Sequence, residues 1–142
     1  MNLVVDASVA AKWLFLEGDS EKAWRLLESA QAGDLQLLAP QILPAEIANA
    51  MWKRIRRGDL DRGLALTLFD AFGAMRFRFF PVPDLIVPAL KLAIHHQHPV
   101  YDCLYLALAI ATPCELVTAD VRLYSTLSPS YPQVRLLRDW RP

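Results

Sequence analysis

The sequence predicts an α/β fold, a three-layer α/β/α sandwich with a short parallel sheet. Short, continuous apolar runs at residues 3–5 and 116–118 are typical of strands that are buried on both faces. Segments with a helical spacing of apolar residues alternate with these runs along the chain. Neither an internal repeat nor a linker interrupts the alternation, so we expect a single domain over residues 1–142.

The expected elements follow from local start and stop signals. Ser20 is a favoured N-cap, Pro44 suits the first turn of a helix, and Asp59 or Asp61 caps a later one. Pro99 separates the last two long helices. In order, we expect strands at residues 3–5, 35–38, 77–82, 116–118 and 134–137, the last at an edge, and helices at residues 8–16, 20–31, 44–57, 62–72, 85–96, 101–111 and 121–127.

Composition indicates a globular protein without a membrane segment. Hydrophobic residues make up 54% of the chain and charged residues 21%, which argues against disorder. The longest apolar run, residues 103–111, is shorter than the ~20 residues that a membrane span needs. The first residues lack the basic, apolar and small-residue pattern of a signal peptide.

Cysteine usage and net charge give two further bounds. Cys103 and Cys114 form no closely spaced pair, which indicates buried thiols in a reducing cytoplasm. The formal net charge is zero, so the chain as a whole has no general attraction for nucleic acid. Any binding of nucleic acid therefore needs local basic patches.

Four acidic residues occupy positions where parallel sheets hold ligands. Asp6 and Asp120 each directly follow an apolar strand, and Glu46 and Asp102 each lie in the first turn of a helix. Because parallel strands end, and their helices begin, at the same edge, all four can converge there. Each acid alone is also explained as a helix cap or as a charge that complements the helix dipole. Four acids at one edge are harder to explain in that way.

This acidic constellation predicts a metal site. Clustered carboxylates repel one another unless a cation neutralises them. Ligands that are all oxygen favour a hard cation, Mg²⁺ or Mn²⁺, over zinc. Two such ions about 4 Å apart can hold the attacking and leaving oxygens of an in-line phosphodiester displacement. Such a site is therefore suited to displacement at a phosphodiester.

Four segments carry a resemblance to a known family: V-V-D-A-S-V-A-A-K-W, P-A-E-I-A-N-A, Y-D-C-L-Y-L-A-L-A and L-V-T-A-D. In this order they resemble the PIN-domain family over essentially the whole chain, and best of all its VapC-type toxin ribonucleases. The resemblance implies Mg²⁺- or Mn²⁺-dependent RNA cleavage, with Asp6, Glu46, Asp102 and Asp120 as the catalytic and metal-binding residues. Cys103 departs from the family pattern, in which alanine is more usual after this aspartate.

Three further residues are candidates for a supporting role. Ser8 and Thr118 match the small hydroxyl residues that the family places beside its acids. Each also has a simpler explanation, Ser8 as an N-cap and Thr118 as a β-branched strand residue. Arg122 follows Asp120 by two positions and can reach a phosphate of the substrate, although an ordinary surface arginine explains it equally well.

Other polar clusters are better explained without a site. The basic residues at 53–57 can hold RNA phosphates, but they also complement a helix C-terminus, which we favour. His95, His96 and His98 lie at a helix end without a partner cysteine, and we expect a solvated patch there. We also expect Lys12 to be solvated.

The leading interpretation is a metal-dependent endoribonuclease, the toxin of a toxin–antitoxin pair, acting on RNA in the cytoplasm. A PIN-like module that binds RNA or a partner without catalysis remains an alternative. A protein that transfers phosphate through an aspartyl phosphate is a weaker one. The segment Asp6-Ala7-Ser8 lacks the second acid of haloacid-dehalogenase-like enzymes, and the acidic pair of receiver domains is absent too.

The resemblance also implies two protein partners, a small antitoxin and a second copy of the chain. Trp52, Leu66, Phe69, Phe72 and Phe77 lie on or near the two middle helices. These are more large apolar residues than one helix face usually needs, which predicts self-association. The alternative is that they fill the core of their own domain.

Overall fold

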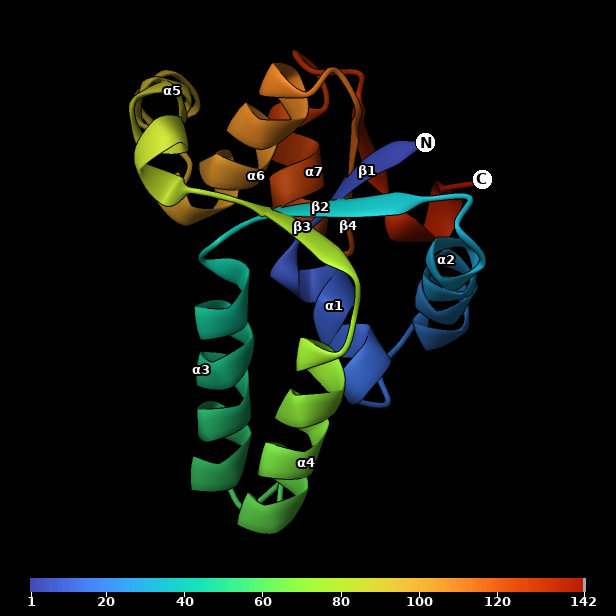
Figure 1. Cartoon of the computed structure of the whole chain (residues 1–142). Helices are drawn as coiled ribbons and strands as arrows, with labels where there is room; N and C mark the ends of the chain where they lie inside the picture. The colour runs from blue at the N-terminus through green and yellow to red at the C-terminus, as the bar shows by residue number, and fades with distance from the viewer. Residues whose placement is uncertain (142) are drawn as a thin grey trace.

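A computed structural model of the chain describes residues 1–141 and contains a five-stranded sheet with helices on both faces (Figure 1). The strands are β1 (Asn2–Val5), β2 (Gln36–Pro40), β3 (Phe77–Phe80), β4 (Glu115–Thr118) and β5 (Val134–Leu136). The helices are α1 (Ala7–Leu14), α2 (Ser20–Ala32), α3 (Leu43–Arg56), α4 (Arg62–Gly73), α5 (Val82–His96), α6 (Val100–Ala111), α7 (Val121–Leu127) and the short 3₁₀ helix η1 (Leu137–Asp139). The predicted three-layer α/β/α sandwich is confirmed.

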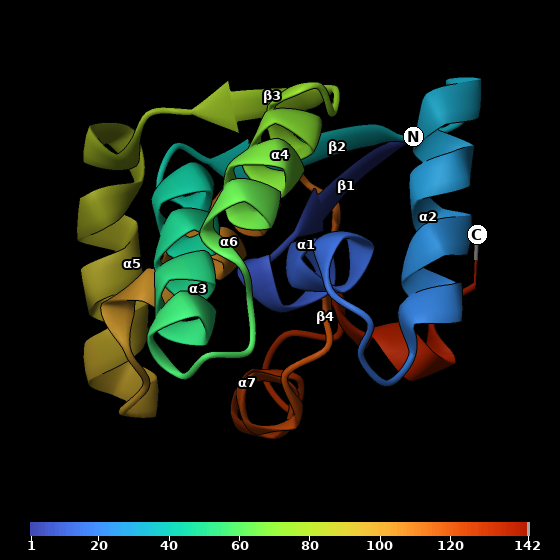
Figure 2. The same ribbon diagram turned by 90° about the horizontal axis from the view of Figure 1, so that it is seen from below.

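All neighbouring strands are parallel and follow the order β3-β2-β1-β4-β5, so β1 is central and β5 lies at an edge as predicted. Helices α5 and α6 lie on one face of the sheet, and α1, α3 and α4 lie on the other (Figures 1 and 2). At the end of β1, Val5 pairs with Val117 of β4, and the Asp6 N–H continues the ladder to the Val117 carbonyl at 3.4 Å. The residues that follow these two strands are therefore neighbours.

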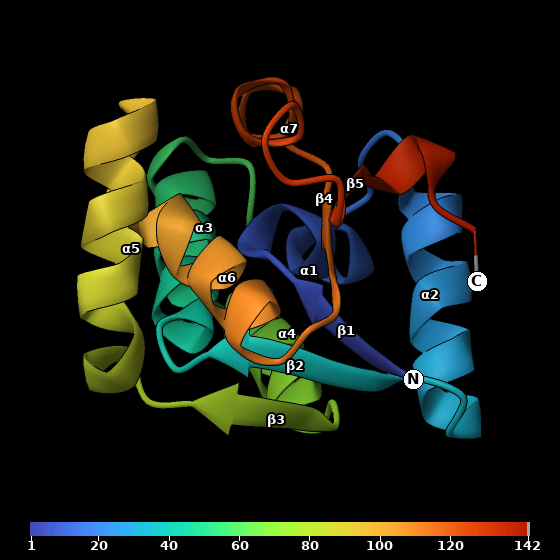
Figure 3. The same ribbon diagram turned by 90° about the horizontal axis from the view of Figure 1, so that it is seen from above.

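The core explains why α6 is fixed over the centre of the sheet. Leu3, Val4 and Val5 are fully buried, as expected for a strand covered on both faces. Residues 103–109 of α6 are all buried, and the helix packs on β1, β2 and β4 (Figure 3). A helix that is apolar on every side belongs in such a position. Its first turn, which carries Asp102, is thereby fixed at the edge where the strands end.

The predicted boundaries on either side of Pro81 are wrong because of where proline is tolerated. The third strand ends before Pro81, which is the N-cap of α5, and Pro83 lies in the first turn of that helix. Proline is well tolerated there because the first helical N–H groups have no partner within the helix. The helix therefore begins at Val82, three residues earlier than predicted. Pro88 lies inside α5 without ending it.

The predicted caps are confirmed in one case and wrong in another. The Asp61 carboxylate accepts a hydrogen bond from the Leu64 N–H at 3.1 Å and caps α4. Ser20 does not cap α2; its hydroxyl donates to the Glu17 carbonyl at 2.6 Å, and Asp19 occupies the cap position. Among the helices within residues 1–141, none is long and apolar enough to cross a lipid bilayer.

Candidate active site

Asp6 occupies the junction between β1 and α1. Its Oδ1 atom accepts hydrogen bonds from the N–H groups of Ser8 at 3.1 Å and Val9 at 3.2 Å, so it caps the helix. The residue is only 5% exposed. The interpretation of Asp6 as a helix cap is therefore correct. A cap does not need to be this deeply buried, however, so capping alone does not explain the position of Asp6.

Two hydroxyl groups connect Asp6 to the end of β4. The Ser8 hydroxyl donates to Asp6 Oδ1 at 2.5 Å, and its oxygen accepts from the Ala119 N–H at 2.8 Å. The Thr118 hydroxyl donates to Asp6 Oδ2 and accepts from the Asp120 N–H at 3.0 Å. Ser8 and Thr118 thus orient both oxygens of the Asp6 carboxylate.

Glu46 lies in the first turn of α3, with one buried oxygen that has no partner. Among the described residues, neither Glu46 Oε1 nor the hydroxyl oxygen of Tyr105 on α6 makes a hydrogen bond. Burial, and then the charges of Asp6 and Asp102, raise the pKa of Glu46 to about 7. The Tyr105 hydroxyl nonetheless opposes the rise in the Glu46 pKa, so these two buried polar atoms lie close together and face the same site.

Asp102 lies in the first turn of α6, where a buried histidine holds it. His98 Nε2 is 2.8 Å from Asp102 Oδ2, and the exposed fraction of the His98 side chain is 3%. The prediction of a solvated histidine patch is wrong for His98, because the chain turns before α6 and places the ring against the carboxylate one helical turn ahead. His96 does not join this contact; its ring lies 3.2 Å from the Tyr131 hydroxyl.

The electrostatics show that three of the four acids share one site. The pKa of Asp6 is raised to about 6, chiefly because the carboxylate is buried. The charge of Asp102 adds to this rise, and the hydrogen bonds from Ser8, Thr118 and Val9 oppose it. Burial, followed by the charges of Glu46, Asp6 and Asp102, also raises the pKa of Tyr105 above its ordinary range. The charge of Asp102 raises the pKa of Asp6, of Glu46 and of Tyr105, which requires that these side chains lie close to Asp102.

Asp120 is attached to this cluster less directly, and Arg122 is not part of it. The exposed Asp120 carboxylate accepts hydrogen bonds from the N–H groups of Arg122 at 2.8 Å and Leu123 at 3.2 Å, and so caps α7. Its connection to Asp6 runs through Thr118. Within residues 1–141 the Arg122 guanidinium makes no hydrogen bond or ion pair, and it is exposed.

The prediction that Lys12 is solvated is also wrong. Its side chain is 12% exposed, donates to the Gly18 carbonyl and lies 3.6 Å from Glu17 Oε2. Arg54 pairs with the same Glu17 carboxylate and stacks 4.0 Å above the Phe15 ring. One member of the basic cluster at 53–57 therefore serves the fold, by tying the loop after α1 to α3.

Sequence reasoning missed two residues of the site, His98 and Tyr105. The spacing of four between His98 and Asp102 could have indicated a contact within one helical turn. Tyr105 carried no separate signal, because its neighbours along α6 are all apolar and buried.

The donor set suits a hard cation, since the carboxylates and the unpartnered Glu46 oxygen are all oxygen ligands. As the side chains stand, no three His, Cys, Asp or Glu residues among those described form a group that could hold a metal ion. Carboxylates repel one another when no cation is bound. Their side chains would therefore have to move closer together to coordinate a cation.

A cluster of one buried and two half-buried carboxylates beyond the strand ends of a parallel sheet defines this protein as an α/β protein with an acidic, oxygen-donor site. The chain belongs to the PIN domain family: the family model matches residues 3–126, which include Asp6, Glu46, Asp102 and Asp120. Because the chain belongs to this family, the alternative function of phosphate transfer through an aspartyl phosphate has no support.

Several relatives are similar over most of their length. Ribonuclease VapC3 of Pyrobaculum aerophilum is 34% identical over 127 residues, 87% of this chain and 92% of the relative. Ribonuclease VapC9 of Mycobacterium tuberculosis is 33% identical over 127 residues, 87% of this chain and 90% of the relative. Ribonuclease VapC1 of the same organism is 30% identical over 137 residues, 95% of this chain and 97% of the relative.

Two solved structures share the fold. The crystal structure of PAE2754 from Pyrobaculum aerophilum superposes with a TM-score of 0.69 at 23% identity, covering 97% of this chain and 93% of that chain. The crystal structure of VapBC2 from Rickettsia felis, bound to a DNA fragment from their promoter, contains a chain with a TM-score of 0.64 at 15% identity. This match covers 96% of this chain and 97% of that chain.

Proposed function

We propose that this protein is a metal-dependent endoribonuclease and the toxin of a toxin–antitoxin pair. The observation that carries the proposal is the gathering of Asp6, Glu46 and Asp102 at one edge of a PIN fold, with a buried Glu46 oxygen left unpartnered. The names of the relatives, all VapC ribonucleases at 30–34% identity, support the same function.

Asp6, Glu46, Asp102 and Asp120 would hold Mg²⁺ or Mn²⁺ at this edge. Bound there, the cation supplies an activated water molecule and neutralises charge on the phosphate. Hydrolysis in which water replaces the 3′ oxygen on phosphorus would leave a 5′ phosphate and a protonated 3′ hydroxyl, and it would not involve the 2′ hydroxyl. The protein's part is positional: Ser8 and Thr118 hold the buried Asp6 carboxylate in a fixed orientation.

Exposed basic side chains would bind the RNA backbone. Arg122 has a free guanidinium two residues beyond Asp120 and can pair with a phosphate. Lys53, Arg56 and Arg57 are exposed at the other end of α3 from Glu46, so they would contact the RNA backbone farther from the acidic edge. An RNA substrate would place the protein in the cytoplasm.

A small antitoxin is the proposed protein partner. The Rickettsia felis structure is of a VapBC pair, and the acidic edge of this chain would accept an arginine or lysine of such a partner in place of a metal. Its helical part would pack in the hollow between α2 and α4, about 480 Å³ in volume and lined by residues that include Trp24, Leu27 and Met75; this hollow lies toward the starts of β2 and β3, away from the acidic edge.

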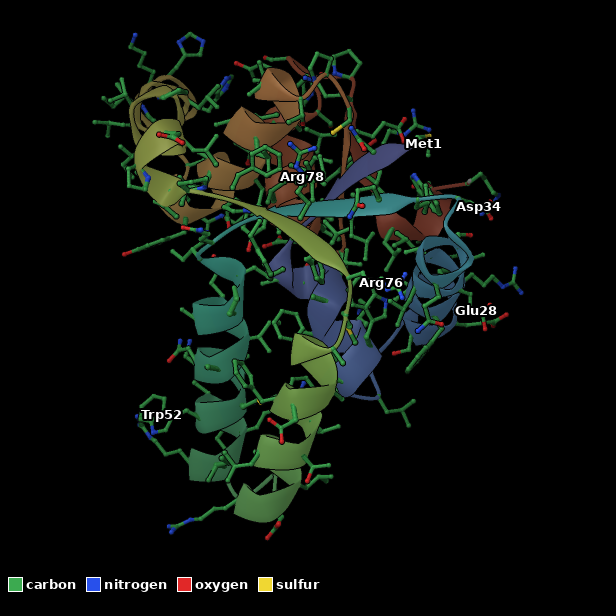
Figure 4. The ribbon with its side chains drawn as sticks, in the orientation of Figure 1. Met1, Glu28, Asp34, Trp52, Arg76 and Arg78 are labelled. Carbon is green, nitrogen blue, oxygen red and sulfur yellow. The ribbon has the colours of Figure 1, made fainter. Side chains whose placement is uncertain are left out.

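A homodimer is the second proposed assembly, on a surface that differs from the predicted one. Phe69, Phe72 and Phe77 pack together with ring centroids 5.9 and 5.8 Å apart, and Phe72 is buried, so they fill the core. Trp52 is 52% exposed and points away from α3 (Figure 4), and Leu66 is also exposed. The larger apolar surface is on α5, where the exposed side chains are Ile86, Val87, Leu90 and Ile94.

The deciding experiment is RNA cleavage by the purified protein with Mg²⁺, with Mn²⁺ and with a chelator. We expect cleavage products with 5′ phosphates only when metal is present, and none from Asp6→Asn or Asp102→Asn. Asp70→Asn, an exposed acid on α4, is the matched control and should cleave like the wild type. A folded wild type that binds RNA without cutting it would instead establish the non-catalytic alternative.

Growth of cells provides a second test of the same proposal. Expression of the wild-type chain alone should slow growth, and co-expression with the antitoxin encoded beside it should restore growth. The Asp6→Asn variant should be harmless in both cases. Equal toxicity of the wild type and this variant would contradict a role for the acidic site in toxicity.

A further inference from the structure

The turn between α5 and α6 is built in a way that buries His98. Helix α5 ends at His96, the following residue Gln97 adopts a left-handed backbone conformation (φ 51°), and α6 begins after Pro99. This conformation is uncommon for a residue other than glycine. It reverses the chain within three residues and carries the ring of His98 beneath the first turn of α6.

The contact that results is directional. An ionised carboxylate can only accept hydrogen bonds, so the Nε2–H of His98 donates to Asp102 Oδ2 over 2.8 Å. The other oxygen, Asp102 Oδ1, accepts no hydrogen bond from any residue between 1 and 141. The Asp102 side chain is 33% exposed against 3% for His98, so the partly exposed acid is held from its buried side.

The acids of the site differ in how they are held. Asp6 is fixed through both oxygens by Ser8 and Thr118, whereas Glu46 has a buried oxygen without a partner. Asp102 is intermediate, with one oxygen bonded and one available. A carboxylate in that state presents a single oriented oxygen to a ligand, and it has fewer rotamers to lose when the ligand binds.

We propose that His98 is a positioning residue, which orients the Asp102 carboxylate so that its other oxygen binds the divalent cation. The inference rests on the proposed function, because it assigns Asp102 to the metal. It gives a buried histidine a role in metal binding although it is not itself a ligand. Hydrogen-bond partners of ligands commonly contribute about 10- to 100-fold to metal affinity or activity.

The test compares two substitutions of His98. His98→Leu keeps an apolar volume and removes the donor, whereas the amide N–H of His98→Gln lies near the position of Nε2 and can still donate. His95→Gln is the matched control, because His95 is an exposed histidine on the same helix end. The readouts are the Mn²⁺ dissociation constant by calorimetry without RNA, and kcat and KM for RNA at saturating Mn²⁺.

We expect His98→Leu to weaken Mn²⁺ binding about 10- to 100-fold. His98→Gln should stay within about threefold of the wild type, and His95→Gln should be unchanged. At saturating Mn²⁺ the His98→Leu variant should regain most of its kcat. Wild-type Mn²⁺ affinity in a folded His98→Leu variant overturns the inference while leaving the proposed function intact. A wild type that binds no Mn²⁺ overturns both.

A measurement on the wild type covers the case in which His98→Leu does not fold. In a ¹⁵N spectrum of the histidine rings, saturating Mg²⁺ should shift the His98 resonances while those of His95 stay in place. The proton of His98 should be on Nε2 both before and after the addition. Unchanged His98 resonances at saturating Mg²⁺, or a proton on Nδ1 alone, would contradict the positioning role.

Discussion

The hydroxyl of Thr118, at the end of β4, donates a hydrogen bond to Oδ2 of Asp6, 112 residues earlier in the chain at the end of β1. The two strands are neighbours in the sheet, and their register places Thr118 one position beyond the pair formed by Val5 and Val117. The bond is therefore a direct product of the parallel topology, and it joins strand pairing to the orientation of a proposed metal ligand.

Thr118→Val tests this relationship because it removes the hydroxyl and keeps the shape. We expect the free energy of unfolding to fall by about 1–3 kcal/mol, since a buried carboxylate oxygen loses its donor. RNA cleavage should fall as well, because Asp6 loses one of its two restraints. Urea unfolding and cleavage rates measure the two effects. Thr126→Val, on α7, is the control, and an equal loss in both variants would show that the bond to Asp6 is unimportant.

Glu46→Gln should stabilise the metal-free protein at pH 8. Because the folded-state pKa of Glu46 is raised to about 7, the folded chain holds this proton more tightly than the unfolded chain does. Stability from this group is therefore present at low pH and is lost as the pH rises from about 4.5 to 7. Glutamine removes that loss, so its melting temperature should exceed the wild type's at pH 8 but not at pH 4.

The matched control for that comparison is Glu28→Gln, an exposed glutamate on α2 (Figure 4). Its melting temperature should track that of the wild type at both pH values. A Glu46→Gln variant that is no more stable than the wild type at pH 8 would contradict the burial and charge crowding of Glu46.

Divalent metal should stabilise the protein, and more strongly at pH 8 than at pH 5. A ligand that binds only the folded state raises the melting temperature, and metal must compete with protons for carboxylates whose pKa values are raised. The pKa values of Asp6 and Glu46, at about 6 and 7, place this change between those two pH values. Melting curves with Mg²⁺, against NaCl at equal ionic strength, measure it, and identical stabilisation at both pH values would count against carboxylate ligands.

Ile94→Asp should dissociate the proposed homodimer. Ile94 is 70% exposed on α5, so the substitution should leave the folded monomer unharmed while it places a charge in the apolar contact. Leu16→Asp, at a 98% exposed position after α1, is the control for an apolar residue outside that surface. Sedimentation at micromolar concentration gives the state of each variant, and a monomeric wild type would argue directly against the assembly.

The position of Asp6 was predictable because a strand and a helix meet there in the local pattern, and the same reasoning located Glu46 and Asp102. The hydrogen bonds among Asp6, Ser8 and Thr118 were predictable only in part. Local sequence shows that each hydroxyl lies two residues from an acid, but the pairing of β1 with β4 brings the two groups together.

The contact between His98 and Asp102 was missed for a different physical reason. Charge and a nearby helix end suggested a solvated histidine, whereas the left-handed backbone of Gln97 decides where the ring goes. Likewise, the apolar pattern of α5 predicts a helix but not its exposed face, and Ile86 and Ile94 are exposed because only one side of the helix packs on α6. Both outcomes depend on tertiary packing, which the periodicity of a single segment does not contain.

The place of β4 in the sheet has a consequence for the synthesis of the protein. When β1, β2 and β3 have been synthesised, the nascent chain contains Asp6 and Glu46 but not yet the strand that supplies Thr118. Until β4 leaves the exit tunnel, β1 is an open edge and the Asp6 carboxylate lacks one of its donors. Competence for catalysis therefore arrives only after most of the chain has emerged.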